Sequence, residues 1–389
     1  MLSVPFNCTG CNACASICPK KCIELKDMGE GFLFPVIDDT KCIQCHQCER
    51  ACLILKEQKK SVRTQAYAIK NIDETERKIS ASGGVFPLLA KYTLDKKGIV
   101  FGAAYDENFE VKHIALTDYS KLPLVQGAKY VQSIIGISFR EAEMELKSGR
   151  KVLFSGTPCQ CAGLKAFLGK EYENLLLVDV ICHGVPSTKV WQTYIDYRSA
   201  KENSGIRPIR INMRSKTSGW SRYGYSTEFD YGYGHITRVR NSQDLFMKAF
   251  VGNICLRNSC SDCPAKGIER CTDFTLGDYW GVWDQHPEFD DNKGTSIVFI
   301  HSEKGKNVFR HLEDKMEYIE VNVEEAYQEN NSLVSSVIAH EKRQDFLEKI
   351  TVENFEEKIR EYFPPVMARS HGILQRVKEK VKSAFHGLV

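Results

Sequence analysis

The sequence predicts a small, cysteine-rich α+β domain at the N-terminus, followed by a larger α/β domain. Three observations support this order. The chain has 389 residues, which at about 150 residues per domain suggests two or three domains. Nine of its 16 cysteines lie within the first 52 residues. Further along the chain, short apolar strands alternate with helical segments, as in domains built around a parallel sheet.

The composition is that of an ordinary soluble protein, with 42% hydrophobic and 26% charged residues, which excludes disordered and collagen-like chains. The formal net charge of +3 is too small for a general nucleic-acid binder. No secretory signal and no apolar run of about 20 residues is visible, so we expect a cytoplasmic protein without a transmembrane segment. In that compartment, many cysteines indicate metal ligands or redox sites rather than disulfides.

The N-terminal cysteines form the same pattern twice, C-x2-C-x2-C-x3-C. The first run is Cys8, Cys11, Cys14 and Cys18, and the second is Cys42, Cys45, Cys48 and Cys52. Three thiolates at this spacing wrap one corner of a 4Fe–4S cluster, and the fourth cysteine reaches the other cluster. One cluster is therefore expected on Cys8, Cys11, Cys14 and Cys52, and the second on Cys42, Cys45, Cys48 and Cys18. The stretch resembles a bacterial two-cluster ferredoxin over residues 1–60.

Zinc is the alternative for these cysteines, but zinc prefers two C-x2-C pairs separated by a spacer. Cys22 fits neither run and is expected to be a small buried hydrophobe. His46 is expected to be a solvated spacer. Residues 56–60 are charged and poor in apolar side chains, which predicts a linker; a docking patch for an acidic partner is the alternative.

Strands and helices alternate in the middle of the chain, which indicates a largely parallel sheet. The expected strands are 98–105, 151–155 and 175–182, and a helix is expected over 159–168. Ligands collect at the carboxyl ends of such strands. Cys159 and Cys182 lie at two of these ends, which favours a functional role over simple burial.

A Ser82-Gly83-Gly84 turn precedes an expected helix over 88–94. Ser82 is a plausible N-cap, and the two glycines let the backbone approach a ligand. Free N–H groups at the helix start could bind a pyrophosphate. An ordinary turn has the same composition, so this pattern alone leaves both interpretations open.

A last group of cysteines consists of Cys255, Cys260, Cys263 and Cys271. Cys260 and Cys263 supply half of a metal site. Either Cys255 and Cys271 complete that site locally, or Cys159 and Cys182 complete it across the fold. Sequence spacing does not decide between them.

Six ordered segments resemble the family of coenzyme F420 hydrogenase/dehydrogenase beta subunits, in the form with an N-terminal two-cluster ferredoxin-type domain. The segments are 82–86, 127–133, 154–160, 182–187, 256–263 and 276–281. The resemblance implies an α+β ferredoxin-like N-terminal domain followed by a larger α/β flavin and iron–sulfur domain. It divides the chain into the ferredoxin-type domain 1–60, the N-terminal region of the beta-subunit fold at 61–145, its C-terminal region at 146–340 and a helical tail at 341–389.

The resemblance also implies cofactors. A flavin, FAD, would exchange hydride with a soluble carrier and pass single electrons to iron–sulfur clusters. A third 4Fe–4S cluster would be held by Cys159, Cys182, Cys260 and Cys263. Cys255 and Cys271 remain as substitute ligands, and Cys161 is expected to serve packing.

Site residues follow from the same motifs. The expected cofactor-binding residues are Ser82, Gly83, Gly84, Lys129, Tyr130, Gly156 and Thr157. Lys129 would stabilise negative charge on phosphate or reduced flavin. His183 would hold or protonate flavin or substrate, or else be a structural histidine. Asp278 and Trp280 would shape the cluster pocket or serve structure alone.

Two further segments have alternative interpretations. The aromatic-rich segment 220–233 predicts a substrate lid or a hairpin with packed tyrosines. The tail 373–389 has the spacing of a basic amphipathic helix, expected to pack on its own domain or a partner, with membrane-surface association as the alternative.

The expected function is an FAD- and iron–sulfur-dependent oxidoreductase. Its partner is a soluble electron carrier, which would be ferredoxin, a nicotinamide or coenzyme F420, and a partner redox subunit is also possible. A non-catalytic electron-transfer subunit that connects a partner enzyme to ferredoxin is the main alternative. A thiol enzyme using Cys159 with His183 as base is a further alternative, but it leaves the other cysteines unexplained. A zinc-dependent binding module is the last, and the near-neutral charge argues against it.

Overall fold

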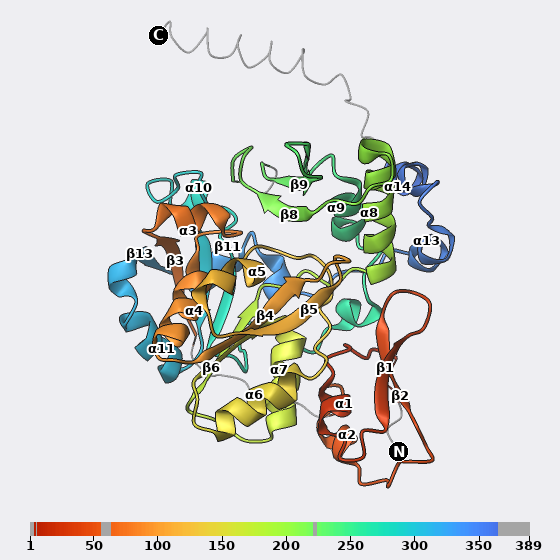
Figure 1. The fold of residues 1–389 in the computed structure, drawn as a ribbon. Coiled ribbons are helices and arrows are strands. Elements are labelled where there is room, and N and C mark those ends of the chain that lie inside the picture. The colour runs from red at the N-terminus through yellow and green to blue at the C-terminus, as the bar shows by residue number, and fades with distance from the viewer. Residues whose placement is uncertain (1–3, 5, 56–63, 221–223, 365–389) are drawn as a thin grey trace, which may run out of the picture.

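The computed structural model describes residues 4, 6–55, 64–220 and 224–364 (Figure 1). The expected linker at 56–60 and the expected tail helix at 373–389 lie outside these residues. An eight-stranded sheet forms the centre, in the order β13-β3-β12-β11-β7-β6-β4-β5. Its strands are β3 (Gln65–Asn71), β4 (Ile99–Tyr105), β5 (Val111–Leu116), β6 (Val152–Gly156), β7 (Leu175–Val180), β11 (Phe274–Asp278), β12 (Ser296–Ile300) and β13 (Met316–Val321).

The sheet is mixed, and the expectation of a largely parallel sheet was wrong. The parallel part consists of β4, β6, β7 and β11. β5 is antiparallel to β4, while β12, β3 and β13 continue the other edge in antiparallel fashion. The three expected strands are present as β4, β6 and β7. Strands from 61–145 and from 146–340 share this one sheet, so the two regions fold together.

Helices cover both faces of the sheet (Figure 1). α4 (Val85–Asp95) and α11 (Glu303–Arg310) bury apolar side chains against one face, together with Val100 and Leu153. α6 (Ser138–Lys147) and α7 (Pro158–Leu168) cover the other, against Phe101 and Phe154. Side chains alternate along a strand, so each strand feeds both cores. The short α3 (Glu74–Ile79) and α12 (Val323–Tyr327) contact β3, α5 (Leu122–Val125) contacts β4, and α10 (Val282–Gln285) follows β11.

The N-terminal unit packs directly on the main domain. It contains α1 (Ala13–Ile17), the hairpin β1 (Ile23–Asp27) and β2 (Leu33–Ile37), and α2 (Gln47–Arg50). Ala13 and Ala51 are buried in the same core as α6 and α7. A Cβ added to Gly163 of α7 would lie 2.9 Å from Cys11 Cβ, so a glycine is what allows α1 to approach this closely.

A second layer stands over the carboxyl ends of the parallel strands. It combines α8 (Thr188–Asn203) and α9 (Leu245–Val251) with α13 (Arg343–Lys349), α14 (Phe355–Tyr362) and the antiparallel strands β8 (Arg210–Ser215), β9 (Ser226–Asp230) and β10 (Ile236–Arg240). Trp191, Tyr194, Phe246 and Phe355 form its core. Within the described residues, no helix is long and apolar enough to cross a membrane.

Candidate functional site

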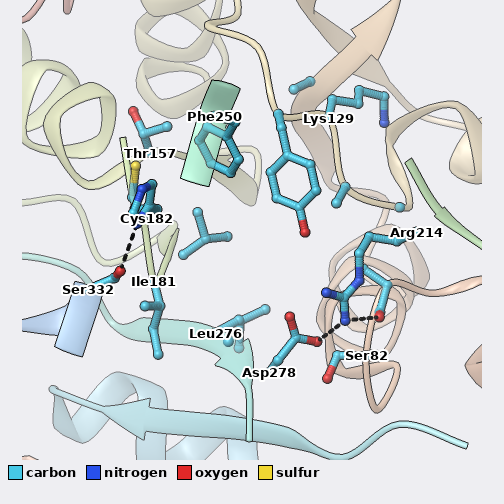
Figure 2. A pocket seen from close by; sticks show the side chains of 18 of the residues that line it. Ser82, Lys129, Thr157, Ile181, Cys182, Arg214, Phe250, Leu276, Asp278 and Ser332 are labelled. Atoms are coloured by element: carbon cyan, nitrogen blue, oxygen red, sulfur yellow. Dashed lines mark hydrogen bonds and ion pairs between the residues drawn. The ribbon is translucent and has the colours of Figure 1, made fainter. Parts of the chain in front are cut away.

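A cavity of about 1020 Å³ lies where the central sheet meets the second layer (Figure 2). The ends of β6, β7 and β11 contribute Gly156, Val180 and Asp278 to its wall. This is the strand-end position at which α/β sheets bind ligands. Figure 2 shows Cys182 and Thr157 at one end and Arg214, Asp278 and Ser82 at the other. The volume is large enough for a dinucleotide cofactor.

All but one of the expected cofactor-binding residues line this cavity. The lining set contains Ser82, Gly84, Lys129, Tyr130, Gly156 and Thr157. Gly83 does not line the cavity. Its N–H points to the neighbouring strand and donates to Ser296 Oγ at 2.9 Å. An added Cβ there would meet the Ile69 carbonyl oxygen at 2.3 Å, so packing against β3 explains the glycine.

Gly84, with a φ of 83°, is the N-cap of α4, and the expectation that Ser82 caps this helix was wrong. The Ser82 hydroxyl instead donates to the Thr295 carbonyl at 2.9 Å. No side chain caps α4. The helix therefore presents its first N–H groups beside the cavity, where Gly84 and Val85 form part of the wall.

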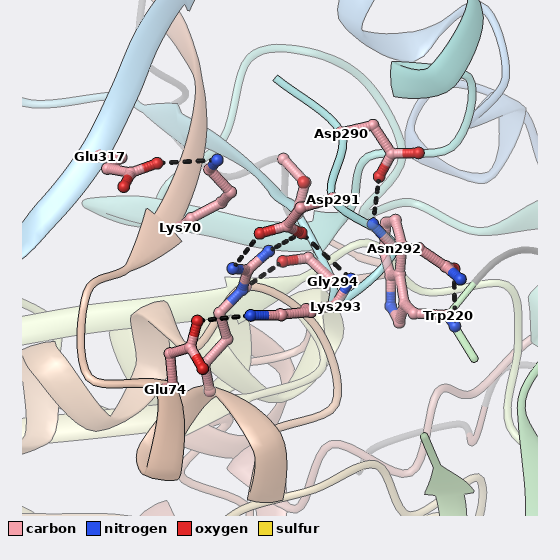
Figure 3. A network of polar contacts seen from close by, with 12 residues as sticks. Lys70, Glu74, Trp220, Asp290, Asp291, Asn292, Lys293, Gly294 and Glu317 are labelled. Carbon is pink, nitrogen blue, oxygen red and sulfur yellow. Dashed lines mark hydrogen bonds and ion pairs between the residues drawn. The ribbon is translucent and has the colours of Figure 1, made fainter. Parts of the chain in front are cut away.

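Cationic side chains hold the backbone around Ser82 in place. Lys216 Nζ donates to the Ser82 carbonyl at 2.5 Å and to the Arg77 carbonyl at 2.6 Å, and burial lowers its pKa to about 7. Arg77 pairs with Asp291, whose loop runs past Gly294 (Figure 3). Lys293 from the same loop pairs with Glu74 at 2.5 Å. These contacts fix the backbone at one end of the cavity.

Lys129 faces the cavity with little to compensate its charge. Its Nζ donates to the Gln126 carbonyl at 2.9 Å and lies 5.7 Å from the Tyr105 ring centre. Burial lowers its pKa to about 8. An anionic ligand in the cavity would restore the charged form, as a lysine that binds phosphate or reduced flavin requires.

His183 borders the cavity with both ring nitrogens engaged. Nε2 lies 2.7 Å from Asn253 Oδ1, and Nδ1 lies 3.3 Å from Ser332 Oγ. The amide oxygen only accepts, so Nε2 carries the proton and Nδ1 accepts from the serine. Burial lowers the pKa of His183, which favours this neutral form. The arrangement suits a histidine that orients its neighbours better than one that donates protons.

Arg214 lines the cavity and was not singled out from the sequence. Its side chain is 2% exposed, and it pairs with Asp278 Oδ1 at 2.9 Å. It stands 3.9 Å from the Tyr225 ring centre and 5.0 Å from that of Trp280. Asp278 and Trp280 thus shape this end of the cavity rather than the cysteine group. No sequence motif connects Arg214 with Asp278 or Trp280, because the contact joins β8 to β11 across the fold.

The segment 220–233 is a packed hairpin in the part that the structure describes. Trp220 is buried and stacks on Trp280 with ring centres 5.2 Å apart. Tyr225 and Tyr231 are also buried, and Tyr225 lines the cavity. These contacts match the hairpin interpretation rather than that of a lid.

The N-terminal cysteines gather in two groups with their fourth members exchanged. Cys8, Cys11 and Cys52 all raise the pKa of Cys14, and burial contributes most to that shift. The second group surrounds a small pocket between the end of α1, β1 and the loop before α2. It contains Cys18, Cys42, Cys45 and Cys48. This is the exchange that the repeated spacing predicts.

Cys22 belongs spatially to the second group. It is buried, as expected, but its Sγ lies 3.4 Å from Cys18 Sγ. Burial raises its pKa to about 11, and Cys18 and Cys42 add to the shift. His46 is exposed and contacts Glu49 at 2.9 Å, which agrees with a solvated spacer.

The third group joins the middle and late cysteines. Burial raises the pKa of Cys159, and the nearby Cys263 and Cys182 raise it further. Burial likewise raises the pKa values of Cys182 and Cys260 to about 12. The structure therefore brings together Cys159, Cys182, Cys260 and Cys263.

The remaining cysteines differ in their surroundings, and the pKa of Cys161 is raised by both Cys271 and Cys159. Cys255 is fully buried in the core of the second layer. Burial raises the pKa of Cys271 to about 11; the charge of Asp179 raises it further, and that of Lys165 lowers it. Cys161 is a buried residue of α7, and its thiol donates to the Val178 carbonyl at 3.4 Å. These positions support packing roles for Cys161 and Cys255.

The chemistry of these groups fits iron–sulfur clusters. Burial and neighbouring cysteines raise the pKa values of Cys14, Cys159, Cys182 and Cys260, and positively charged iron would compensate their thiolates. The pKa of Cys18 is lowered instead, because hydrogen bonds from Cys22 and from backbone N–H groups outweigh the opposing effect of burial. Among the residues described, no three His, Cys, Asp or Glu side chains are arranged to hold one metal ion. Groups of four cysteines, divided as in two-cluster ferredoxins, match clusters better than zinc sites.

The groups and the cavity follow one another through the molecule. Cys18 raises the pKa of Cys48 in the second N-terminal group, and Cys11 of the first group raises the pKa of Cys159. Thr157 Oγ1 lies 3.2 Å from Cys159 Sγ, and both Thr157 and Cys182 reach the cavity. The series therefore runs from the second N-terminal group through the first and third groups to the cavity.

Comparisons with known proteins match both parts of the chain. Residues 149–326 match the family described as the C terminus of the coenzyme F420 hydrogenase/dehydrogenase beta subunit. Residues 7–54 match the 4Fe-4S dicluster domain. Over 189 residues the chain is 25% identical to the F subunit of the F(420)H(2) dehydrogenase from Methanosarcina mazei, a match that covers 44% of this chain and 51% of that protein. The chain thus spans about half the length of this curated relative.

A solved structure also resembles the chain. It is a chain of the xenon-derivatised F420-reducing NiFe hydrogenase complex from Methanosarcina barkeri. The two are 18% identical with a TM-score of 0.45, and the match covers 78% of this chain and 92% of the other.

Proposed function

Because the chain joins a 4Fe-4S dicluster domain to the C-terminal domain of coenzyme F420 hydrogenase/dehydrogenase beta subunits, we propose that it is an iron–sulfur flavoprotein oxidoreductase. It passes electrons between a hydride carrier at FAD in the cavity and three 4Fe–4S clusters. The ligands of the third cluster are Cys159, Cys182, Cys260 and Cys263.

One observation carries this proposal. Cys182, whose pKa is raised by Cys260 and Cys263, also lines the cavity, and Cys11 of the N-terminal unit raises the pKa of Cys159, which supports a series from the N-terminal groups to the cavity. FAD supplies the conversion between hydride and single electrons, and 4Fe–4S clusters carry one electron each. A thiol enzyme or a zinc module gives no reason for such a series.

Different residues of the chain bind different parts of FAD and the third cluster. The free N–H groups of α4, with Gly84 as N-cap, and Lys129 bind the anionic parts of FAD. Tyr130 and Phe250, with ring centres 5.2 Å apart, give the cavity an apolar wall for a planar ring. His183 orients Asn253 and Ser332 at the rim. Lys266 Nζ donates to the Cys182 carbonyl and keeps a cation beside the third cluster.

Coenzyme F420 is the first carrier to test, because the name of the curated relative contains its reduced form. Nicotinamide and ferredoxin remain the other candidates. A partner redox protein would take or supply the single electrons at the second N-terminal cluster, whose ligand Cys45 is partly exposed.

The test mixes anaerobic, cluster-loaded protein with reduced coenzyme F420 or with NADH and follows cluster reduction by electron paramagnetic resonance. We expect reduction of the N-terminal clusters in the wild type and in Cys271→Ser. Reduction is lost in Cys159→Ser, which interrupts the series. Equal reduction of the N-terminal clusters in Cys159→Ser would refute the route. Failure of both carriers, with clusters that dithionite still reduces, would favour a non-catalytic electron-transfer protein.

A further inference from the structure

Arg257 joins the N-terminal unit to the third cysteine group. It begins a short helical turn, Asn258–Asp262, and is 2% exposed. Its Nε donates to the Cys8 carbonyl at 2.7 Å, and its Nη2 donates to the Leu33 carbonyl at 2.9 Å. Its Nη1 donates to Gln132 Oε1 at 3.1 Å. One guanidinium therefore contacts both β2 and the first cluster-binding loop.

Among the residues that the structure describes, no carboxylate pairs with Arg257. Within residues 4, 6–55, 64–220 and 224–364, its hydrogen-bond acceptors are two carbonyls and one amide. The aromatic rings of Phe34 and Phe32 lie 4.3 Å and 5.6 Å from its guanidinium carbon. A buried charge without a counterion is strongly unfavourable. A neighbouring group must therefore supply the negative charge once the protein has bound its cofactors.

The groups that interact with this charge are cysteines from two different sites. Cys8 belongs to the first N-terminal group, and Cys260 and Cys159 belong to the third group. The guanidinium also fits closely against the first loop, because a Cβ added to Gly10 would lie 2.9 Å from Arg257 Nη1. Arg257 thus occupies the space between two cluster-binding sites.

Resting on the proposed function, we propose that Arg257 is the shared countercharge of the first and third clusters and raises the reduction potentials of both. Each cluster takes up one electron, with no bond formed or broken, and becomes one unit more negative. A fixed positive charge nearby stabilises that reduced state. Electrons are therefore drawn inward toward these two clusters, relative to the second N-terminal cluster.

The second N-terminal cluster has a different electrostatic setting. Arg140 donates to the Ser16 carbonyl at 2.9 Å and to the Cys18 carbonyl at 3.4 Å, but it is only partly buried. Lys41 is exposed and already pairs with Asp38 at 2.7 Å. Neither contact involves Arg257, so removing Arg257 leaves this cluster as an internal reference.

The experiment is a redox titration, followed by electron paramagnetic resonance, of anaerobic full-length protein with measured iron content. The variants are Arg257→Gln, which removes the charge, and Arg257→Lys, which keeps it. Arg343→Gln is the matched control. Arg343 is also buried and lies over Phe32, but it pairs with Glu30 at 2.8 Å.

For Arg257→Gln we expect the equilibrium between the second N-terminal cluster and each of the other two to shift about tenfold toward the second. This corresponds to potentials lower by ~59 mV for one electron. Arg257→Lys and Arg343→Gln keep wild-type potentials. An unchanged titration of iron-replete Arg257→Gln would overturn the proposal, as would an equal shift in Arg257→Lys.

If Arg257→Gln does not retain its clusters, the Arg257→Lys variant tests the proposal instead. Full iron with wild-type potentials supports the proposal, because charge is then sufficient. Loss of iron, or lowered potentials, in Arg257→Lys overturns it, because the fork of hydrogen bonds would then be what matters. A wild-type protein with fewer than three clusters would instead contradict the proposed function, so the two failures are distinguishable.

Discussion

At the scale of single residues, the third group of cysteines is where sequence and structure complement each other. Spacing alone left two sets of ligands possible. The fold places Cys159 at the start of α7 and Cys182 after β7, and both meet Cys260 and Cys263. Cys255 is buried in the core of the second layer, and the charges that act on the pKa of Cys271 are those of Asp179, Lys165 and Arg270. The choice depends on which strands are neighbours, and spacing does not contain that information.

Serine substitution tests this choice directly. Cys159→Ser removes one ligand of the third cluster, so we expect about four fewer iron atoms per chain. Cys271→Ser is the matched control and should keep the wild-type content, because Cys271 is outside the group. Iron and acid-labile sulfide are measured on anaerobic protein. The reverse result, with iron lost only from Cys271→Ser, would require a different ligand set.

Lys129 gives a pH-dependent prediction. Its pKa is about 8 in the folded chain and 10.5 ordinarily, so the unfolded chain binds its proton more tightly. The free energy of unfolding should therefore rise with pH between these values, relative to Lys129→Met. Denaturant unfolding of flavin-free protein from about pH 7 to about pH 10 measures the difference. Bound FAD should remove this dependence on pH. A stability difference that stays constant with pH in flavin-free protein would show that the pKa of Lys129 is not lowered.

Arg214 and Arg257 show what sequence reasoning missed at this scale. Both are buried cations at the sites that the cysteines and glycines mark. Arg257 even lies within a segment that resembles the family, yet nothing in its neighbours indicates that its side chain reaches Cys8. Contacts between residues about 250 positions apart depend on the fold, and a single sequence carries no signal for them.

At the scale of elements, α7 connects the N-terminal unit to the cavity. Thr157 and Gln160 form a capping box at its start, and Gly169, with a φ of 67°, ends it. These are sequence signals, and the helix was predicted to within one residue. The direction of β12 and β3 was not predicted, because apolar strands read the same in parallel and antiparallel neighbours.

Gly163 in the middle of α7 tests the docking of the two parts. Gly163→Val adds side-chain atoms where even a Cβ would lie 2.9 Å from Cys11 Cβ. We expect the free energy of unfolding to fall by about 1–3 kcal/mol, as for other overpacked contacts. Slower electron exchange between the first and third clusters should accompany it. A variant as stable as the wild type would show that α1 does not rest on α7.

At the scale of the whole molecule, the cysteine groups and the cavity are positioned by one continuous core. Ala13 and Ala51 of the N-terminal unit share a core with α6 and α7. Cys182 of the third cysteine group lines the cavity between the central sheet and the second layer. The small domain could be predicted from its repeated spacing, whereas its close packing on the main domain could not. Small residues at a contact, such as Gly163, are recognisable only once the partner is known.

The most direct test of the account is the cofactor content of anaerobically purified protein: iron, acid-labile sulfide, zinc and released flavin per chain. Three clusters and one flavin predict about twelve iron atoms, about twelve sulfides and one FAD. About eight iron atoms without flavin would leave only the N-terminal clusters and remove the flavoprotein proposal. Zinc in place of iron and sulfide would contradict the account entirely.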